Sequence, residues 1–181
     1  MKRYVAFLRG INVGGKNSVS MKSLRELFSS SYYDVVTYLN SGNVIFSSDN
    51  DDVDYISRDI SNKIESVLGM KILVYVISVS DLEELLDNSP SWWGSSSSDI
   101  YDNVIFIIRP YTYYDVSLAL GSPDSRYEKV FNYKDKVFWS FDLNNYRKSV
   151  WWKKSASSSV SGFITIRTAN TVRKVLEICK R

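Results

Sequence analysis

The sequence predicts an α+β protein made of two ferredoxin-like plaits, each a four-stranded antiparallel sheet with helices on one face. Two observations predict this class. Short apolar runs and segments with helical spacing follow one another in the order βαββαβ, and an extra helix completes the first half. The second half repeats this order, although the halves share negligible sequence identity. The strands are apolar on both faces, as in residues 104–108, so we expect the two plaits to be packed together.

The first half is expected to contain four strands and three helices. The strands are predicted at residues 3–9, 35–39, 44–48 and 71–78. The helices are predicted at residues 21–30, 53–68 and 80–88. Ser20 should cap the first helix, and the second should follow the acidic run 49–52 and end at Gly69. A capping box of Ser80 and Glu83 should begin the third.

The second half is expected to repeat the pattern. Its strands are predicted at residues 103–109, 127–133, 137–141 and 163–167. Its helices are predicted from Thr112 to Gly121 and over residues 170–180. Between them, Asn144 should cap a helix that contains Tyr146, Val150 and Trp151. The second and third strands should form a hairpin about Lys134 and Asp135. The serine-rich segment 89–99 is the expected linker, which places the two domains at residues 1–90 and 100–181.

The composition excludes several kinds of chemistry. The chain has no histidine, which removes Ser-His-Asp and Cys-His catalysis. Cys179 is the single cysteine, so neither an intramolecular disulfide nor an ordinary zinc site is expected. We predict no cofactor and no metal, and we favour binding over catalysis. The net charge of +3 is compatible with nucleic acid or a phosphorylated ligand without arguing for either.

The N-terminal residues are too polar to direct the chain to a membrane. The apolar run at residues 4–8 is shorter than the apolar region of a signal peptide. No stretch approaches the roughly 20 apolar residues that span a bilayer. We therefore expect a cytoplasmic protein that does not contact a membrane.

Three segments carry motifs that resemble those of a known family. Residues 4–17, 38–44 and 165–172 read YVAFLRGINVGGKN, YLNSGNV and TIRTANTV. They resemble the motifs of an uncharacterised, mostly bacterial family, domain of unknown function 1697, and the resemblance covers essentially the whole chain. It implies paired plait-like subdomains and supplies no activity, cofactor or catalytic residue. One departure is Ala169, where the family pattern implies a tryptophan.

The glycine-rich segment 10–17 lies between a predicted strand and a predicted helix. Its spacing is one residue shorter than a P-loop, and Asn17 stands where a P-loop needs Ser or Thr to hold magnesium. The helix is also expected to begin too late for its amides to point into the loop. Two interpretations stay open. Turned backbone N–H groups with Lys16 and Arg9 bind an anion, or the segment is only a tight turn closed by its Asn side chains.

A second candidate anion contact lies near the C-terminus. Arg167 ends a predicted strand, and Thr168 or Asn170 should cap the last helix, although capping alone also explains these residues. If the two regions converge, they form a polar, cationic site for an anionic small molecule or a nucleic acid. The candidate ligand-binding residues are Arg9, Asn12, Lys16, Asn17, Asn43, Arg167 and Asn170.

The aromatic residues offer further alternatives. In RNA-recognition plaits, aromatics on the central strands stack on bases, but core packing is the simpler account of Phe46 and of the aromatics at 138–141. Two tryptophan pairs stand at residues 92–93 and 151–152, and one member of each is expected to be buried. Basic residues flank Trp151-Trp152, which is a candidate surface for a protein partner or for self-association.

A metal-dependent hydrolase is the third hypothesis for the function. It would hold magnesium through Asp or Glu side chains. No paired-carboxylate spacing in the sequence supports it. We therefore place it after the binding module and the interaction module.

Overall fold

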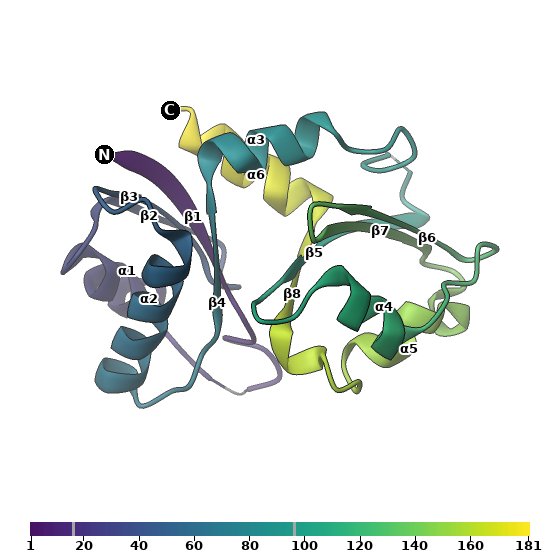
Figure 1. The fold of residues 1–181 in the computed structure, drawn as a ribbon, viewed down its shortest axis with the longest axis horizontal. Coiled ribbons are helices and arrows are strands. Elements are labelled where there is room, and N and C mark those ends of the chain that lie inside the picture. The colour runs from purple at the N-terminus through teal and green to yellow at the C-terminus, as the bar shows by residue number, and fades with distance from the viewer. Residues whose placement is uncertain (16, 96) are drawn as a thin grey trace. The chain divides into compact units, whose positions relative to one another are not determined.

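The computed structural model describes residues 1–15, 17–95 and 97–181. By its internal contacts the chain forms two compact units, unit 1 (residues 1–84 with 175–181) and unit 2 (residues 85–174). Each unit contains one four-stranded antiparallel sheet with helices (Figure 1). The predicted α+β class with two similar subdomains is confirmed. The domain boundaries at 90 and 100, and the packing of the plaits together, stay predictions.

The sheet of unit 1 has the strand order β2-β3-β1-β4. The strands are β1 (Lys2–Leu8), β2 (Tyr33–Tyr38), β3 (Asn43–Ser48) and β4 (Val74–Ser78). β1 pairs antiparallel with both β3 and β4, so Ala6 lies opposite Val44 on one side and Val76 on the other. This is the strand order of the split βαβ plait that the element order predicts.

Three helices follow these strands: α1 (Met21–Ser29), α2 (Val53–Leu68) and α3 (Val79–Asp87). The hydroxyl of Ser20 accepts the N–H of Ser23 at 3.0 Å, which confirms the predicted cap of α1. Gly69 ends α2 with a φ of 67°, a left-handed conformation that favours glycine. α1 and α2 cover one face of the sheet (Figure 1).

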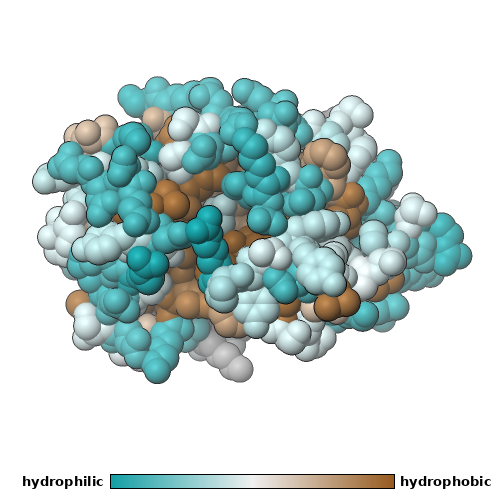
Figure 2. Space-filling view, viewed as in Figure 1, coloured by the Kyte–Doolittle hydropathy of each residue, from teal (hydrophilic) through white to brown (hydrophobic). Residues whose placement is uncertain are grey.

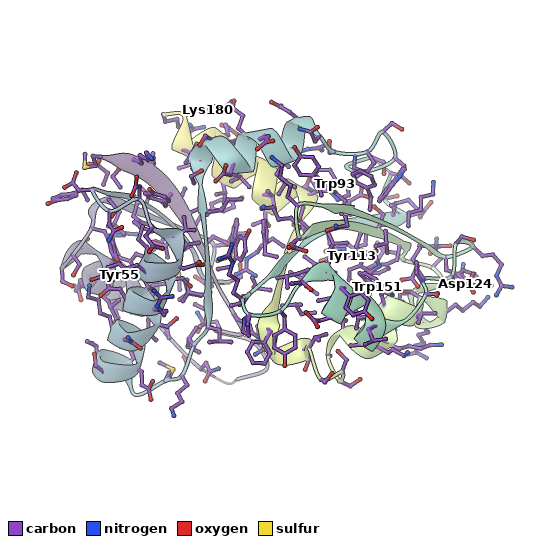
Figure 3. All side chains as sticks on the ribbon, in the orientation of Figure 1. Tyr55, Trp93, Tyr113, Asp124, Trp151 and Lys180 are labelled. Atoms are coloured by element: carbon purple, nitrogen blue, oxygen red, sulfur yellow. The ribbon has the colours of Figure 1, made fainter. Side chains whose placement is uncertain are left out.

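The predicted start of α3 is wrong. The hydroxyl of Ser78 accepts the N–H of Asp81 at 3.0 Å, so the helix begins at Val79, directly after β4. The expected capping box of Ser80 and Glu83 does not form because Ser78 already occupies that role. Glu83 instead accepts a hydrogen bond from Lys180, at the end of the chain beside α3 (Figure 3).

An aromatic cluster centres the core of unit 1. Phe46 of β3 lies 5.5 Å from Phe28 and 4.8 Å from Tyr32, measured between ring centroids. Tyr4 stacks on the same ring at 5.8 Å. All four side chains are buried. Each such ring contributes roughly 1.5–3 kcal/mol by leaving water, so this cluster fixes α1 and β3, the elements next to segment 10–17.

The sheet of unit 2 has the matching order β6-β7-β5-β8. The strands are β5 (Ile100–Ile107), β6 (Glu128–Tyr133), β7 (Lys136–Asp142) and β8 (Ile164–Thr168). β5 begins three residues before the predicted strand because Asp102 pairs with Ser140 of β7, which gives its buried carboxylate a hydroxyl partner. Lys134 and Asp135 both have positive φ, as a two-residue hairpin turn requires, and the predicted hairpin is confirmed.

The helical segments of unit 2 differ from the prediction at one place. They are α4 (Tyr113–Leu120), the 3₁₀ turns η1 (Tyr146–Lys148) and η2 (Ser161–Phe163), α5 (Val150–Ser155), and α6 (Ala169–Cys179), whose end belongs to unit 1. The single helix predicted from Asn144 is wrong. Ser149 is extended, with a ψ of 128°, and its hydroxyl accepts the N–H of Trp152 at 3.0 Å. Ser149, not Asn144, therefore caps the helix that carries the tryptophans.

A buried carboxylate holds the start of α5. Glu128 of β6 is 3% exposed. Its oxygens accept hydrogen bonds from the Ser149 hydroxyl at 2.6 Å, the Val150 N–H at 2.8 Å and the indole N–H of Trp139 at 3.1 Å. Trp151 is fully buried and donates its indole N–H to the Gly121 carbonyl at 2.8 Å, next to α4 (Figure 3). These contacts fasten α5 to the core of unit 2.

Within the part of the chain that the structure describes, no helix is long and apolar enough to cross a membrane.

Candidate functional site

A hollow of about 410 Å³ lies beside the glycine-rich segment in unit 1. Its wall comes from the loop between β1 and α1, the first residue of α1, and the turn between β2 and β3. The lining residues are Asn12, Gly15, Ser18, Val19, Ser20, Met21 and Asn40. The loop and the helix start thus line one hollow, which the sequence does not predict.

Two asparagine side chains close the loop. Asn12 donates from Nδ2 to the carbonyls of Val19 at 2.9 Å and Asn40 at 2.8 Å, and its Oδ1 accepts the N–H of Val19 at 2.8 Å. Asn17 donates from its Nδ2 to the Gly10 carbonyl at 3.1 Å. Both asparagines have positive φ, which this residue type tolerates better than most. Their side chains therefore shape the hollow, as the turn interpretation expects.

Asn43 has a structural role as well. It is fully buried at the start of β3, and its Nδ2 donates to the Tyr38 carbonyl at 2.8 Å and to the Ser41 hydroxyl at 3.0 Å. The preceding Gly42 has a φ of 75°. A Cβ there would lie 2.8 Å from side-chain atoms of Leu8. This turn places Asn40 against the loop.

Three residues that line the hollow have backbone N–H groups without a partner in the described part of the chain. Within the described residues, the backbone N–H groups of Gly15, Ser18 and Met21 have no acceptor. The first turn of α1 contains no acidic residue that would compete for an anion. Free N–H groups at a helix start carry partial positive charge, and this charge attracts anions.

The two basic residues predicted here have different positions. The backbone N–H of Arg9 donates to the Leu73 carbonyl at 2.9 Å, so the end of β1 is fixed to the residue before β4. The side chain of Arg9 is partly exposed and does not line the hollow. Lys16 lies outside the described residues.

The remaining two predicted residues belong to unit 2. Arg167 is 8% exposed and donates from Nη1 to the Thr165 hydroxyl at 2.9 Å and to the Ile166 carbonyl at 2.8 Å. Burial lowers the pKa of this guanidinium to about 10, so it stays protonated at neutral pH. The hydroxyl of Thr168 accepts the N–H of Thr171 at 3.3 Å, which identifies the cap of α6 and leaves Asn170 exposed.

The structure thus brings together only part of the predicted set. Asn12 lines the hollow, while Asn17 and Asn43 support it from the loop and the turn. The convergence of these residues with Arg167 and Asn170 stays a prediction. Ser18 and Asn40 were not predicted as lining residues, and only the run Asn-Ser-Gly-Asn at residues 40–43, which is typical of a turn, points to the second.

The aromatic side chains behave as core residues. Phe46, Phe138, Trp139 and Phe141 are all at most 2% exposed, so the core-packing interpretation is confirmed for them. The tryptophan pairs each contain one buried member, Trp93 and Trp151. Trp152 is 43% exposed.

No set of carboxylates stands out as a metal site. In residues 1–15, 17–95 and 97–181, no three Asp, Glu or Cys side chains gather where they could hold a metal ion. The lining of the hollow also contains no carboxylate.

Two four-stranded antiparallel sheets with helices, in two similar subdomains, define the chain as an α+β protein. The model of the family described as "Protein of unknown function (DUF1697)" matches residues 1–139, so the chain belongs to that family. Among solved structures, the conserved bacterial protein SP0830 from Streptococcus pneumoniae is similar, with 29% sequence identity, a TM-score of 0.84 and 98% of each chain covered. No curated protein matches the chain. Neither the family nor this neighbour indicates a specific function.

Proposed function

We propose that this protein binds a small anionic ligand of the phosphate-bearing class in the hollow beside segment 10–17. The observation that carries the proposal is that Gly15, Ser18 and Met21 line the hollow and that their backbone N–H groups have no acceptor among the described residues. Oriented amides at a loop and a helix start suit the oxygens of a phosphate.

The size of the hollow suits a small ligand. Its volume of about 410 Å³ falls within the roughly 300–1,000 Å³ of small-molecule sites. The hydrogen bonds of Asn12 to Val19 and Asn40 fix the wall before a ligand arrives, which lowers the entropic cost of binding. Lys16 adjoins the lining residue Gly15 in sequence and supplies a positive charge to this loop.

Binding fits the site better than catalysis. The lining residues include neither a carboxylate nor another group that titrates near neutral pH. The chain also contains no histidine that could serve as a general base. The site therefore offers hydrogen-bond donors without a proton acceptor suited to acid–base chemistry.

Ser18→Asp tests the proposal. Ser18 is exposed, and its hydroxyl makes no hydrogen bond among the described residues, so the substitution adds a negative charge to the hollow without removing a contact. Isothermal titration with inorganic phosphate, nucleoside monophosphates and sugar phosphates should show affinity that Ser18→Asp lowers at least about tenfold. Asn62→Asp, at an exposed position on α2, adds the same charge away from the hollow and is the matched control. Equal affinities of the two variants would refute the proposal.

A further inference from the structure

The segment that follows β7 is strongly basic. Residues 143–154 contain four basic residues and no acidic residue. The basic residues are Arg147, Lys148, Lys153 and Lys154. All four are exposed, and in the described part of the chain none of them forms an ion pair with a carboxylate. Lys148 interacts electrostatically with Asp142, which precedes this segment, and the positive charge of the other three basic residues is available to an anionic partner.

Partly exposed aromatic rings lie beside this charge. Trp152 is 43% exposed, and its ring lies 5.3 Å from the buried ring of Phe141 and 5.3 Å from the ring of Tyr146, edge to face with the latter at 81°. Tyr101 is 38% exposed, and its ring centroid lies 5.3 Å from that of Phe141. Phe141 therefore supports the rings of Trp152 and Tyr101, and Tyr146 packs against Trp152.

Cations lie directly against these and neighbouring rings. The guanidinium of Arg147 lies 5.6 Å from the ring centroid of Tyr146, and its Nε donates to the Tyr146 hydroxyl at 3.0 Å. The ammonium of Lys148 lies 5.0 Å from the ring centroid of Tyr127. We call Tyr101, Tyr127, Tyr146, Arg147, Lys148, Trp152 and Lys153 the α5 surface. It combines flat apolar faces with positive charge.

The α5 surface is held rigidly. Glu128 accepts hydrogen bonds from Ser149 and Val150, between the two cations of η1 and Trp152. Trp151, which precedes Trp152, is fully buried, and Trp152 packs on the buried ring of Phe141. The rings and charges are therefore placed before any partner arrives, and little conformational entropy is lost on binding.

The positive charge belongs to unit 2 as a whole. Residues 85–174 contain twelve basic and eight acidic residues, whereas the rest of the chain contains eleven basic and twelve acidic residues. Figure 2 shows mainly hydrophilic and intermediate residues, with some hydrophobic atoms between them, over the part of unit 2 around α4 and α5. By its charged residues, unit 2 is therefore the basic part of the chain.

We propose that the α5 surface binds single-stranded nucleic acid, with phosphates at Arg147, Lys148 and Lys153 and a base stacked on Trp152. Proteins that bind single strands without sequence preference combine a basic surface with exposed aromatic rings in this way. A second copy of the chain fits less well, because a symmetric contact through this surface would bring like charges together. An acidic peptide would use the charges and leave the rings without a planar partner.

Fluorescence anisotropy tests this proposal on the full chain. The probes are labelled single-stranded RNA and DNA of about twelve nucleotides, at about 50 mM salt and again at about 200 mM salt. The account predicts binding that weakens with salt, and that the double variant R147E/K153E weakens at least about tenfold. K22E/K71E makes the same charge change at exposed lysines of unit 1 and should leave the affinity within about twofold.

Two aromatic variants separate stacking from charge. Trp152→Ala should weaken binding about fivefold or more, while Trp152→Phe, which keeps a ring against Phe141, should retain most of the affinity. Tyr55→Ala removes an exposed ring from α2 of unit 1 (Figure 3) and is the control. Ser18→Asp should leave oligonucleotide affinity unchanged. The proposal of anion binding in the hollow and the proposal of oligonucleotide binding at the α5 surface can therefore fail independently.

Several outcomes would overturn the proposal. One is that the unchanged protein, shown to be folded by a cooperative melting transition, does not bind either oligonucleotide at about 50 mM salt. Another is an equal loss in R147E/K153E and K22E/K71E. A third is tighter binding of a poly-glutamate peptide than of either oligonucleotide, which would assign the surface to an acidic protein. A dimer that Trp152→Ala dissociates, without oligonucleotide binding, would assign it to self-association.

Discussion

The carboxylate of Glu128 accepts the hydroxyl of Ser149 at 2.6 Å, across 21 residues of sequence, and this contact decides where α5 begins. Ser149 is extended and Val150 starts the helix, with its N–H also on Glu128 at 2.8 Å. A buried carboxylate that satisfies several donors stabilises the fold mainly because those donors have no other partner.

Glu128→Leu is expected to destabilise unit 2 by about 2–4 kcal/mol, because it leaves the donors at Ser149, Val150 and Trp139 buried without an acceptor. All five tryptophans lie within residues 85–174, so their fluorescence during urea unfolding reports on this unit. Glu65→Leu, at an exposed carboxylate of α2, should change the free energy of unfolding by less than about 0.5 kcal/mol. A loss for Glu128→Leu as small as that would contradict the assigned role.

Ser149→Ala should cost about 1–2 kcal/mol, because it removes both the cap of α5 and a partner of Glu128. Ser149→Ala and Glu128→Leu both remove the hydrogen bond between these two side chains. The double variant should therefore lose less free energy of unfolding than the sum of the two single losses. A double-mutant cycle by urea unfolding measures the difference. Strict additivity would mean that the two side chains act independently.

Gly42→Ala is expected to destabilise unit 1 by more than about 2 kcal/mol, since a left-handed residue would gain a Cβ only 2.8 Å from side-chain atoms of Leu8 and Ile11. Gly69→Ala is the matched control, because its φ is similar at 67° and its Cβ would meet no atom within 4 Å. Its cost should be about 1 kcal/mol, the left-handed strain alone. Thermal unfolding followed by circular dichroism compares the two, and equal shifts would contradict the packing account.

Cys179 is expected to react slowly with thiol reagents. It is 8% exposed, and burial raises the pKa of its thiol to about 11, against which the charge of Arg3 acts weakly. The unfolded thiol ionises near its ordinary value of 9.0, so this residue makes stability fall as pH rises from about 9 toward 11. Disulfide exchange at pH 8 should therefore be limited by opening of the fold. A rate equal to that of the unfolded chain would show that the thiol is accessible.

Much of the fold follows from local signals in the sequence. Ser20, Gly69 and the turn at Lys134 and Asp135 act where they were predicted, because a cap or a hairpin turn depends on a few neighbouring residues. The order of elements also predicts the strand order of both sheets, since the split βαβ plait is its natural arrangement.

Two helix starts were predicted wrongly, one because it depends on a residue distant in sequence and the other because two nearby serines could each cap the helix. The break before α5 depends on Glu128, which is 21 residues away from Ser149 and reads in the sequence as an ordinary strand residue. The start of α3 was missed because Ser78 and Ser80 are both good caps, and the end of β4 selects the first.

The candidate site was predictable only in part, for the same physical reason. The glycine and asparagine spacing indicates a tight loop, and Asn12 and Asn17 do close one. The hollow also needs Asn40, whose carbonyl accepts from Asn12 across 28 residues. The hydrophobic periodicity and turn residues that predict local structure do not predict this contact between distant residues.

The most direct test of the central claim is the affinity of the full chain for inorganic phosphate and nucleoside monophosphates, measured by isothermal titration for the unchanged chain, Ser18→Asp and Asn62→Asp. The account predicts saturable binding to the unchanged chain and to Asn62→Asp, and affinity at least about tenfold weaker for Ser18→Asp. Absence of binding to the unchanged chain, or equal binding by all three, would contradict the assignment of an anion site to the hollow.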